Sequence, residues 1–166
     1  MNARTAVILL AAAALTACAV PNGPTQSSGW EDTSDLLPLT DVYLVRSNSG
    51  VDSRVGRLIL DRPTWIAVWD SITANLGDKR PAPPDIDFNY TVVLLAAAGS
   101  TPTQLVSFRI TDVHSRPDFL RVMVEVNWPA AACGSVPVVT TPLHVVAVPR
   151  VATEAQFTFT DTTTSC

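Results

Sequence analysis

The sequence has 166 residues, with 11 Lys and Arg against 15 Asp and Glu, which gives a net charge of −4. A mildly acidic chain without a run of basic residues argues against nucleic acid as a partner. The length that remains after an N-terminal signal suits one domain of ordinary size, and few charged but many β-branched residues favour a compact β domain.

The N-terminus has the pattern of an export signal. One basic residue, Arg4, precedes an unbroken apolar run from Ala6 to Leu15. This run is far shorter than the roughly 20 residues of a membrane-spanning helix, and it matches the hydrophobic region of a secretory signal. Leu15-Thr16-Ala17-Cys18 then resembles the lipobox of bacterial lipoproteins, which implies cleavage before Cys18 and lipid on that cysteine. The alternative is an ordinary signal peptide, cleaved after an Ala-x-Ala-like site, with Cys18 unmodified.

The segment after Cys18 has the composition of a tether. Residues 19–34 are rich in Pro, Gly, Ser, Thr, Asn and Gln, and such a segment cannot bury enough apolar surface to fold. We therefore expect a signal peptide at 1–17, a lipid-anchored linker at 18–35 and a single β-rich domain at 36–166. The expected location is the bacterial cell envelope, with the chain held to a membrane by lipid. By resemblance to lipoprotein sorting patterns, Ala19 rather than Asp favours the outer membrane of a Gram-negative cell.

One helix is predicted, over residues 61–76. Asp61 is a candidate N-cap, Pro63 falls in the first turn, and Gly77 supplies a C-terminal stop. The apolar face of this helix consists of Trp65, Val68, Trp69, Ile72 and Leu76.

Strand patterns fill the rest of the domain. We expect Trp128 to continue the inward-facing residues of its strand and to be part of the core, and Asn48–Gly50 to form a turn between the first two strands. The fold class is thus mainly β with one helix (α+β), an antiparallel sandwich or rolled sheet. We expect the helix to cover one open end, with Trp65 and Trp69 buried against the sheet. The seven predicted strands are 41–46, 54–60, 91–98, 106–111, 120–128, 143–148 and 156–160.

The order of these features resembles a known family. The helix with Trp65 and Trp69, the Asp87-Phe88 entry to a buried strand and the strand from Thr141 to Pro149 are similar to the C-terminal domain of PrcB-type protease complex subunits. The resemblance implies a non-catalytic envelope protein that associates with a protease, and it carries over no catalytic residues. A glycine-rich turn of the family keeps only its first glycine here, Gly99, so no binding role is carried over to that loop.

The two histidines, His114 and His144, are the first candidates for metal binding or catalysis. A zinc site needs three or four ligands, usually with a close pair, and the sequence has no such pair. We therefore expect no metal and no cofactor. A hydrolase would need a Ser-His-Asp site without a G-x-S-x-G motif, or Cys133 as a nucleophile beside either histidine. Asp85 and Asp87 could serve acid–base chemistry or calcium binding, but capping of the loop before the buried strand is the favoured interpretation.

Two cysteines remain after Cys18 is assigned to lipid. In an oxidising compartment Cys133 and Cys166 form an even pair, and we expect a disulfide between them. The alternatives are two unpaired thiols or pairing with another chain. Thiol titration of the oxidised, denatured protein distinguishes these possibilities.

The expected function is that of a non-catalytic, membrane-anchored accessory or interaction domain, with an unidentified protein partner for which the resemblance suggests a protease. We retain two alternatives. One is a small envelope hydrolase with an unrecognised site. The other is a module that binds a peptide or ligand at a sheet edge.

Overall fold

The structure is a computed structural model that describes residues 35–133 and 137–165. The predicted signal peptide, the lipidation site Cys18 and nearly all of the predicted linker lie outside the described residues, as does Cys166. In the part that is described, no helix is both long enough and apolar enough to cross a membrane.

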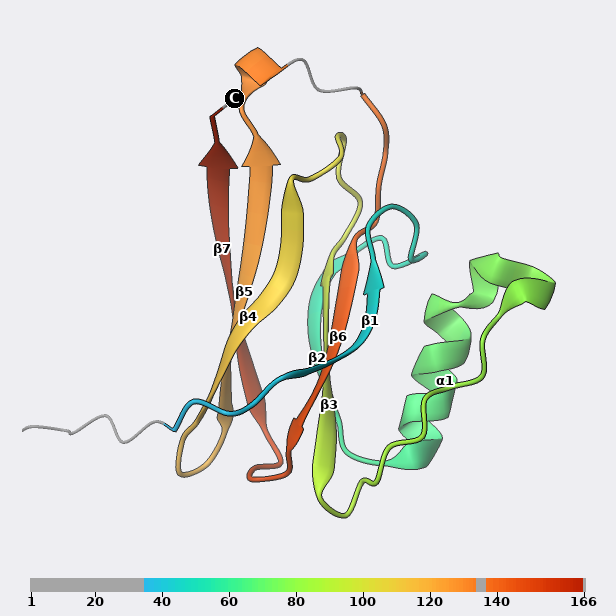
Figure 1. The fold of residues 1–166 in the computed structure, drawn as a ribbon, viewed down its shortest axis with the longest axis vertical. Coiled ribbons are helices and arrows are strands. Elements are labelled where there is room, and N and C mark those ends of the chain that lie inside the picture. The colour runs from blue at the N-terminus through green and yellow to red at the C-terminus, as the bar shows by residue number, and fades with distance from the viewer. Residues whose placement is uncertain (1–34, 134–136, 166) are drawn as a thin grey trace, which may run out of the picture. The chain divides into compact units, whose positions relative to one another are not determined.

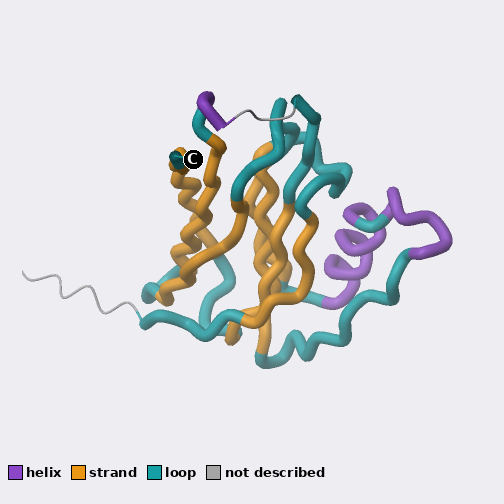
Figure 2. Tube along the Cα trace, turned by 45° about the horizontal axis from the view of Figure 1, so that its top comes forward, coloured by secondary structure: helices purple, strands orange, loops and turns teal. Residues whose placement is uncertain are grey.

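Residues from 35 onward form three layers, two β-sheets and a helix (Figures 1 and 2). The mainly β class with seven strands is confirmed. The four-stranded sheet has the order β1 (Thr40–Val45), β6 (Leu143–Pro149), β3 (Thr91–Ala98) and β2 (Arg54–Ile59). The three-stranded sheet has the order β4 (Ser107–Ser115), β5 (Leu120–Pro129) and β7 (Ala155–Thr164). The helices are α1 (Arg62–Ile72) and the short 3-10 helices η1 (Ala74–Lys79) and η2 (Ala131–Cys133).

The four-stranded sheet is buried on both faces, which explains the continuous apolar run of β3. One face of β3, with Val92 and Leu94, packs against the alternating apolar residues of β5 in the other sheet. The opposite face, with Val93 and Leu95, packs against α1. The helix therefore covers the outer face of a sheet rather than an open end of the sandwich, which corrects the predicted placement.

Trp65 and Trp69 anchor α1 to this face, as predicted, with only 1% and 2% of their surface exposed. Asp61 caps the helix by accepting a hydrogen bond from the Thr64 N–H at 2.8 Å. The indole N–H of Trp69 donates to the Pro81 carbonyl at 2.9 Å. The Pro-rich loop after the helix thus satisfies the polar edge of a buried aromatic side chain.

The helix ends earlier than predicted. The α-helical path stops at Ile72, and the next residue, Thr73, bonds through Oγ1 to the Trp69 carbonyl at 2.6 Å. The chain continues as η1, in which Gly77 has a positive φ of 52°. Leu76 is consequently 40% exposed and does not belong to the apolar face.

One predicted feature of strand pairing is wrong. β5 and β7 pair in parallel, because the chain enters β7 from β6 in the other sheet and not from a hairpin with β5. Asn48–Gly50 lies between β1 and β2, but it does not join them as a hairpin, since the two strands occupy opposite edges of the four-stranded sheet. Trp128 packs against the core but is only half-buried, and its indole N–H donates to Asp161.

Candidate binding cleft

The sandwich has two lateral sides, each formed by one edge strand from each sheet. We name them the β1/β4 side and the β2/β7 side. On the β1/β4 side, the segment before β1 first pairs with the end of β4 and then crosses to the other sheet (Figure 1). Leu37 N–H donates to the Val113 carbonyl at 2.8 Å, and Ser115 N–H donates to the Asp35 carbonyl at 2.9 Å. Among residues 35–133 and 137–165, no strand pairs with the outer edge of β4 between its start at Ser107 and Val113.

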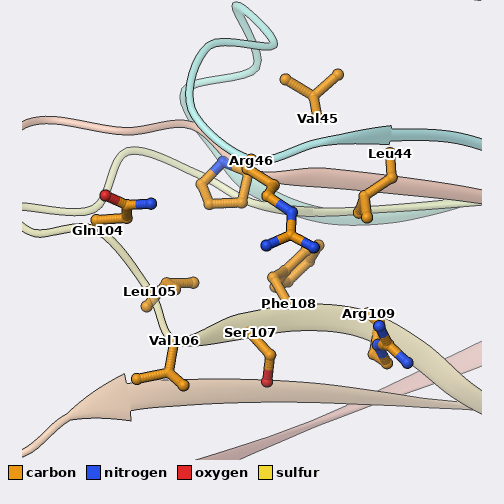
Figure 3. A pocket seen from close by; sticks show the side chains of 10 residues that line it. Leu44, Val45, Arg46, Gln104, Leu105, Val106, Ser107, Phe108 and Arg109 are labelled. Atoms are coloured by element: carbon orange, nitrogen blue, oxygen red, sulfur yellow. The ribbon is translucent and has the colours of Figure 1, made fainter.

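A small pocket lies where β4 begins, and we call it the β4 cleft (Figure 3). Its volume is about 70 Å³. Figure 3 shows the side chain of Arg46 reaching into the pocket toward Phe108, with Leu44 beside it. Leu44 is 40% exposed although it is apolar. The lining residues are Leu44, Val45 and Arg46 at the end of β1, residues 104–109 leading into β4, and Pro142.

The charge of the β4 cleft is opposite to that of the chain. Its lining includes two cations, Arg46 and Arg109, and no acidic residue, whereas the whole chain carries a net charge of −4. Both arginines are exposed, and neither forms an ion pair with another described residue. Two guanidinium groups beside apolar side chains can bind a carboxylate or a phosphate.

His144 joins the two sheets next to this cleft. It is 4% exposed, and its Nδ1 accepts a hydrogen bond from the Ile110 N–H of β4 at 2.9 Å. Its Nε2 lies 3.1 Å from Asp41 Oδ1 on β1. Because the backbone N–H can only donate, Nδ1 carries no proton, and the neutral ring donates its Nε2 proton to Asp41. Burial lowers the pKa of His144; the carboxylate of Asp41 opposes this effect, and Arg109 adds a smaller lowering.

This geometry gives His144 a structural role. Both ring nitrogens are already engaged, so neither offers a lone pair to a substrate proton or a metal ion. The other candidate, His114, lies near the opposite end of β4, opposite Leu36. In the described segments, no group of three or more His, Cys, Asp or Glu side chains is arranged to hold a metal ion.

The two aspartates considered for chemistry are engaged in local contacts. Asp85 forms an ion pair with Arg62. Asp87 Oδ1 accepts hydrogen bonds from the Asn89 N–H at 2.9 Å and the Asn89 side-chain amide at 2.8 Å, and its carbonyl accepts from Thr91 N–H. The capping interpretation is confirmed for Asp87, whereas Asp85 is an exposed partner of Arg62. Asp85, Asp87 and Asp41 also line a wider groove of about 540 Å³.

The predicted disulfide between Cys133 and Cys166 stays a prediction, because Cys166 lies outside the described residues. The Sγ atom of Cys133 lies 3.9 Å from the carbonyl oxygen of Thr164, two residues before Cys166.

Arg46 and Arg109 were not among the predicted site residues. Arg46 directly follows β1 and Arg109 lies within β4, and nothing in the sequence indicates that the two segments meet.

The architecture defines a mainly β sandwich with one helix on its outer face and an arginine-lined cleft at one lateral side. A scan of protein-family models and searches of curated proteins and of solved structures found no match to this chain.

Proposed function

We propose that this chain is a lipid-anchored protein of the bacterial envelope whose domain binds another protein and is not a catalyst. The anchor is proposed from the Leu15-Thr16-Ala17-Cys18 motif and the tether after it. A protease is the partner class that the resemblance to PrcB-type subunits suggests.

The observation that carries the binding function is the β4 cleft. Two arginines, Arg46 and Arg109, line this cleft without an acidic residue, although the chain carries a net charge of −4. Neither forms an ion pair within the described ranges, and both lie beside the exposed apolar side chains of Leu44 and Val106. Arginine next to apolar surface at a strand edge is typical of a site that another chain covers.

Site-specific photo-crosslinking in the native host tests this function. A photoreactive residue in place of Val106, at the cleft, is compared with one in place of Val151, between β6 and β7. The two valines are 50% and 51% exposed, so they offer matched access. We expect a discrete crosslinked protein from position 106 and none from position 151. Equal products from both positions, or none from either, would contradict a specific contact at the cleft.

The anchor is tested separately. Mass spectrometry of the protein from its native membrane should find an acylated N-terminus at Cys18, and a Cys18→Ser variant should no longer sediment with membranes. An unmodified N-terminus at another residue would contradict the proposed lipidation.

A further inference from the structure

We infer that the β4 cleft binds an extended acidic segment of the partner, added as a short strand along the outer edge of β4 at Ser107–Arg109. This inference rests on the proposed function, and it specifies the chemistry of the partner.

The edge of β4 already binds a strand elsewhere along its length. Residues 35–37 pair with its last residues through hydrogen bonds of 2.8 and 2.9 Å. This pairing ends at Leu37, and the chain then crosses through Pro38 to β1 in the other sheet. A strand from another chain can occupy the same edge further toward the start of β4. It would end before Ile110, because the N–H of that residue is bonded to His144.

The size of the pocket favours a side chain rather than a separate ligand. A volume of about 70 Å³ has room for little more than the end of one side chain. Leu44 and Phe108 line it with apolar surface, and Arg46 reaches into it (Figure 3). A glutamate fits this combination, since its methylene groups can contact the apolar wall while its carboxylate bonds to the guanidinium.

The charges favour the same occupant. Arg109 lies on the strand that would receive the added segment, so a second acidic residue of that segment can pair with it. Because the N–H of Ile110 faces this edge, the N–H and C=O of Phe108, two residues earlier, face it as well. An extended segment can bond to both groups of Phe108, whereas a lipid phosphate or a free anion has no N–H to donate to the carbonyl. We therefore assign the site to an acidic polypeptide.

Selection of short random peptides on the purified full chain tests this assignment. We expect enriched peptides that alternate acidic and β-branched residues. The binding of a labelled enriched peptide should weaken about tenfold or more in the double variant Arg46→Glu/Arg109→Glu, because each reversal replaces a charge-assisted bond with repulsion. The control is Arg57→Glu/Arg121→Glu, which changes the net charge equally at two exposed arginines outside the cleft. Binding to this control should remain within about twofold of the unmodified protein.

Four outcomes would overturn the inference: no enrichment, enrichment without acidic residues, equal weakening in both double variants, or displacement of the peptide by vesicles of anionic phospholipid. The last outcome would assign the cleft to a lipid headgroup. If crosslinks from position 106 persist while acidic peptides fail, the partner-binding function stands and only its acidic-strand chemistry falls.

Discussion

The two lateral sides of the sandwich differ in whether their arginines bond to a carboxylate. On the β2/β7 side, Arg54 donates two hydrogen bonds to Asp161, at 2.9 and 2.8 Å, and its guanidinium lies 5.4 Å from the ring centroid of Phe159. Trp128 donates to the same carboxylate at 2.8 Å. On the β1/β4 side, Arg46 and Arg109 line a cleft without such a partner.

The way the sheets approach each other differs as well. On the β2/β7 side, Gly56 allows close contact, because a Cβ atom there would lie 2.1 Å from the Phe157 ring. On the β1/β4 side the connection is polar, through His144 and the Ile110 N–H. One side is thus held by direct packing and a charge pair that spans both sheets, and the other by a buried histidine that leaves an open edge beside it.

The largest expected loss of stability comes from a residue that supports both sides. Trp69 holds α1 on the sheet that the two sides share, so Trp69→Ala should lower the free energy of unfolding by about 3–5 kcal/mol. Urea unfolding measures this loss. The control is Leu76→Ala in the following 3-10 helix η1, which should cost less than about 0.5 kcal/mol because Leu76 is exposed. A loss below about 1 kcal/mol for the tryptophan would show that α1 contributes little.

His144 makes the β1/β4 side sensitive to pH. Its pKa is lowered from 6.5 in the folded chain, chiefly by burial, so below pH 6.5 the unfolded chain binds a proton that the folded chain does not. The contribution of His144 to stability is therefore complete above pH 6.5 and is lost as the pH falls toward its folded pKa. The slope is at most about 1.4 kcal/mol per pH unit.

The variant His144→Ala separates this contribution from the rest of the fold. It should cost about 1–3 kcal/mol at pH 7.5, since it leaves the buried Ile110 N–H without an acceptor. Urea unfolding from pH 7.5 to 5.5 should show a smaller loss of stability on acidification than in the unmodified protein. Trp69→Ala serves as the comparison, because it should retain the original pH dependence. An unchanged pH dependence in His144→Ala would contradict the assignment.

Sequence patterns predicted the local features of this fold and missed those that depend on distant pairing. The apolar spacing of Trp65 and Trp69 and the alternation along 120–128 each reflect a burial pattern that repeats within a few residues. The direction of β7 relative to β5 leaves no such pattern, because an alternating strand reads alike in a parallel or an antiparallel pair. The length of α1 was overestimated because Leu76 keeps the helical spacing after the chain has left the α-helix.

The candidate site depends even more on contacts between segments that are distant in the sequence. His144 was recognised as a chemically interesting residue, but its partners Asp41 and Ile110 lie on two other strands, so its structural role is visible only in the fold. Arg46 and Arg109 come from segments that meet only when the two sheets pack together.

On the β2/β7 side, the charge pair should have a modest, salt-dependent effect. The side chains of Arg54 and Asp161 are 39% and 44% exposed, so solvent screens their attraction. We expect Arg54→Gln to cost about 0.5–1 kcal/mol, with a smaller loss in high salt. A double-mutant cycle with Asp161→Asn, followed by urea unfolding, measures the coupling. A coupling near zero would mean that close packing at Gly56 is sufficient to hold this side together.

The smallest effects are expected at the β4 cleft, and they sharpen the contrast between the two sides. Arg46→Ala and Arg109→Ala should each change the stability at pH 7.5 by no more than about 0.5 kcal/mol, because neither side chain has an ion-pair partner among the described residues.

The two variants should differ in the stability that they lose between pH 7.5 and pH 5.5. The charge of Arg109 contributes to the low pKa of His144, so its removal raises that pKa toward 6.5 and narrows the gap to the unfolded chain. Arg109→Ala should therefore lose less stability on acidification than the unmodified protein, while Arg46→Ala should follow it. Urea unfolding of both variants at the two pH values measures this difference. A loss above about 1 kcal/mol at pH 7.5 in either variant would show that the fold needs these arginines, and would remove the main reason for treating them as a binding surface.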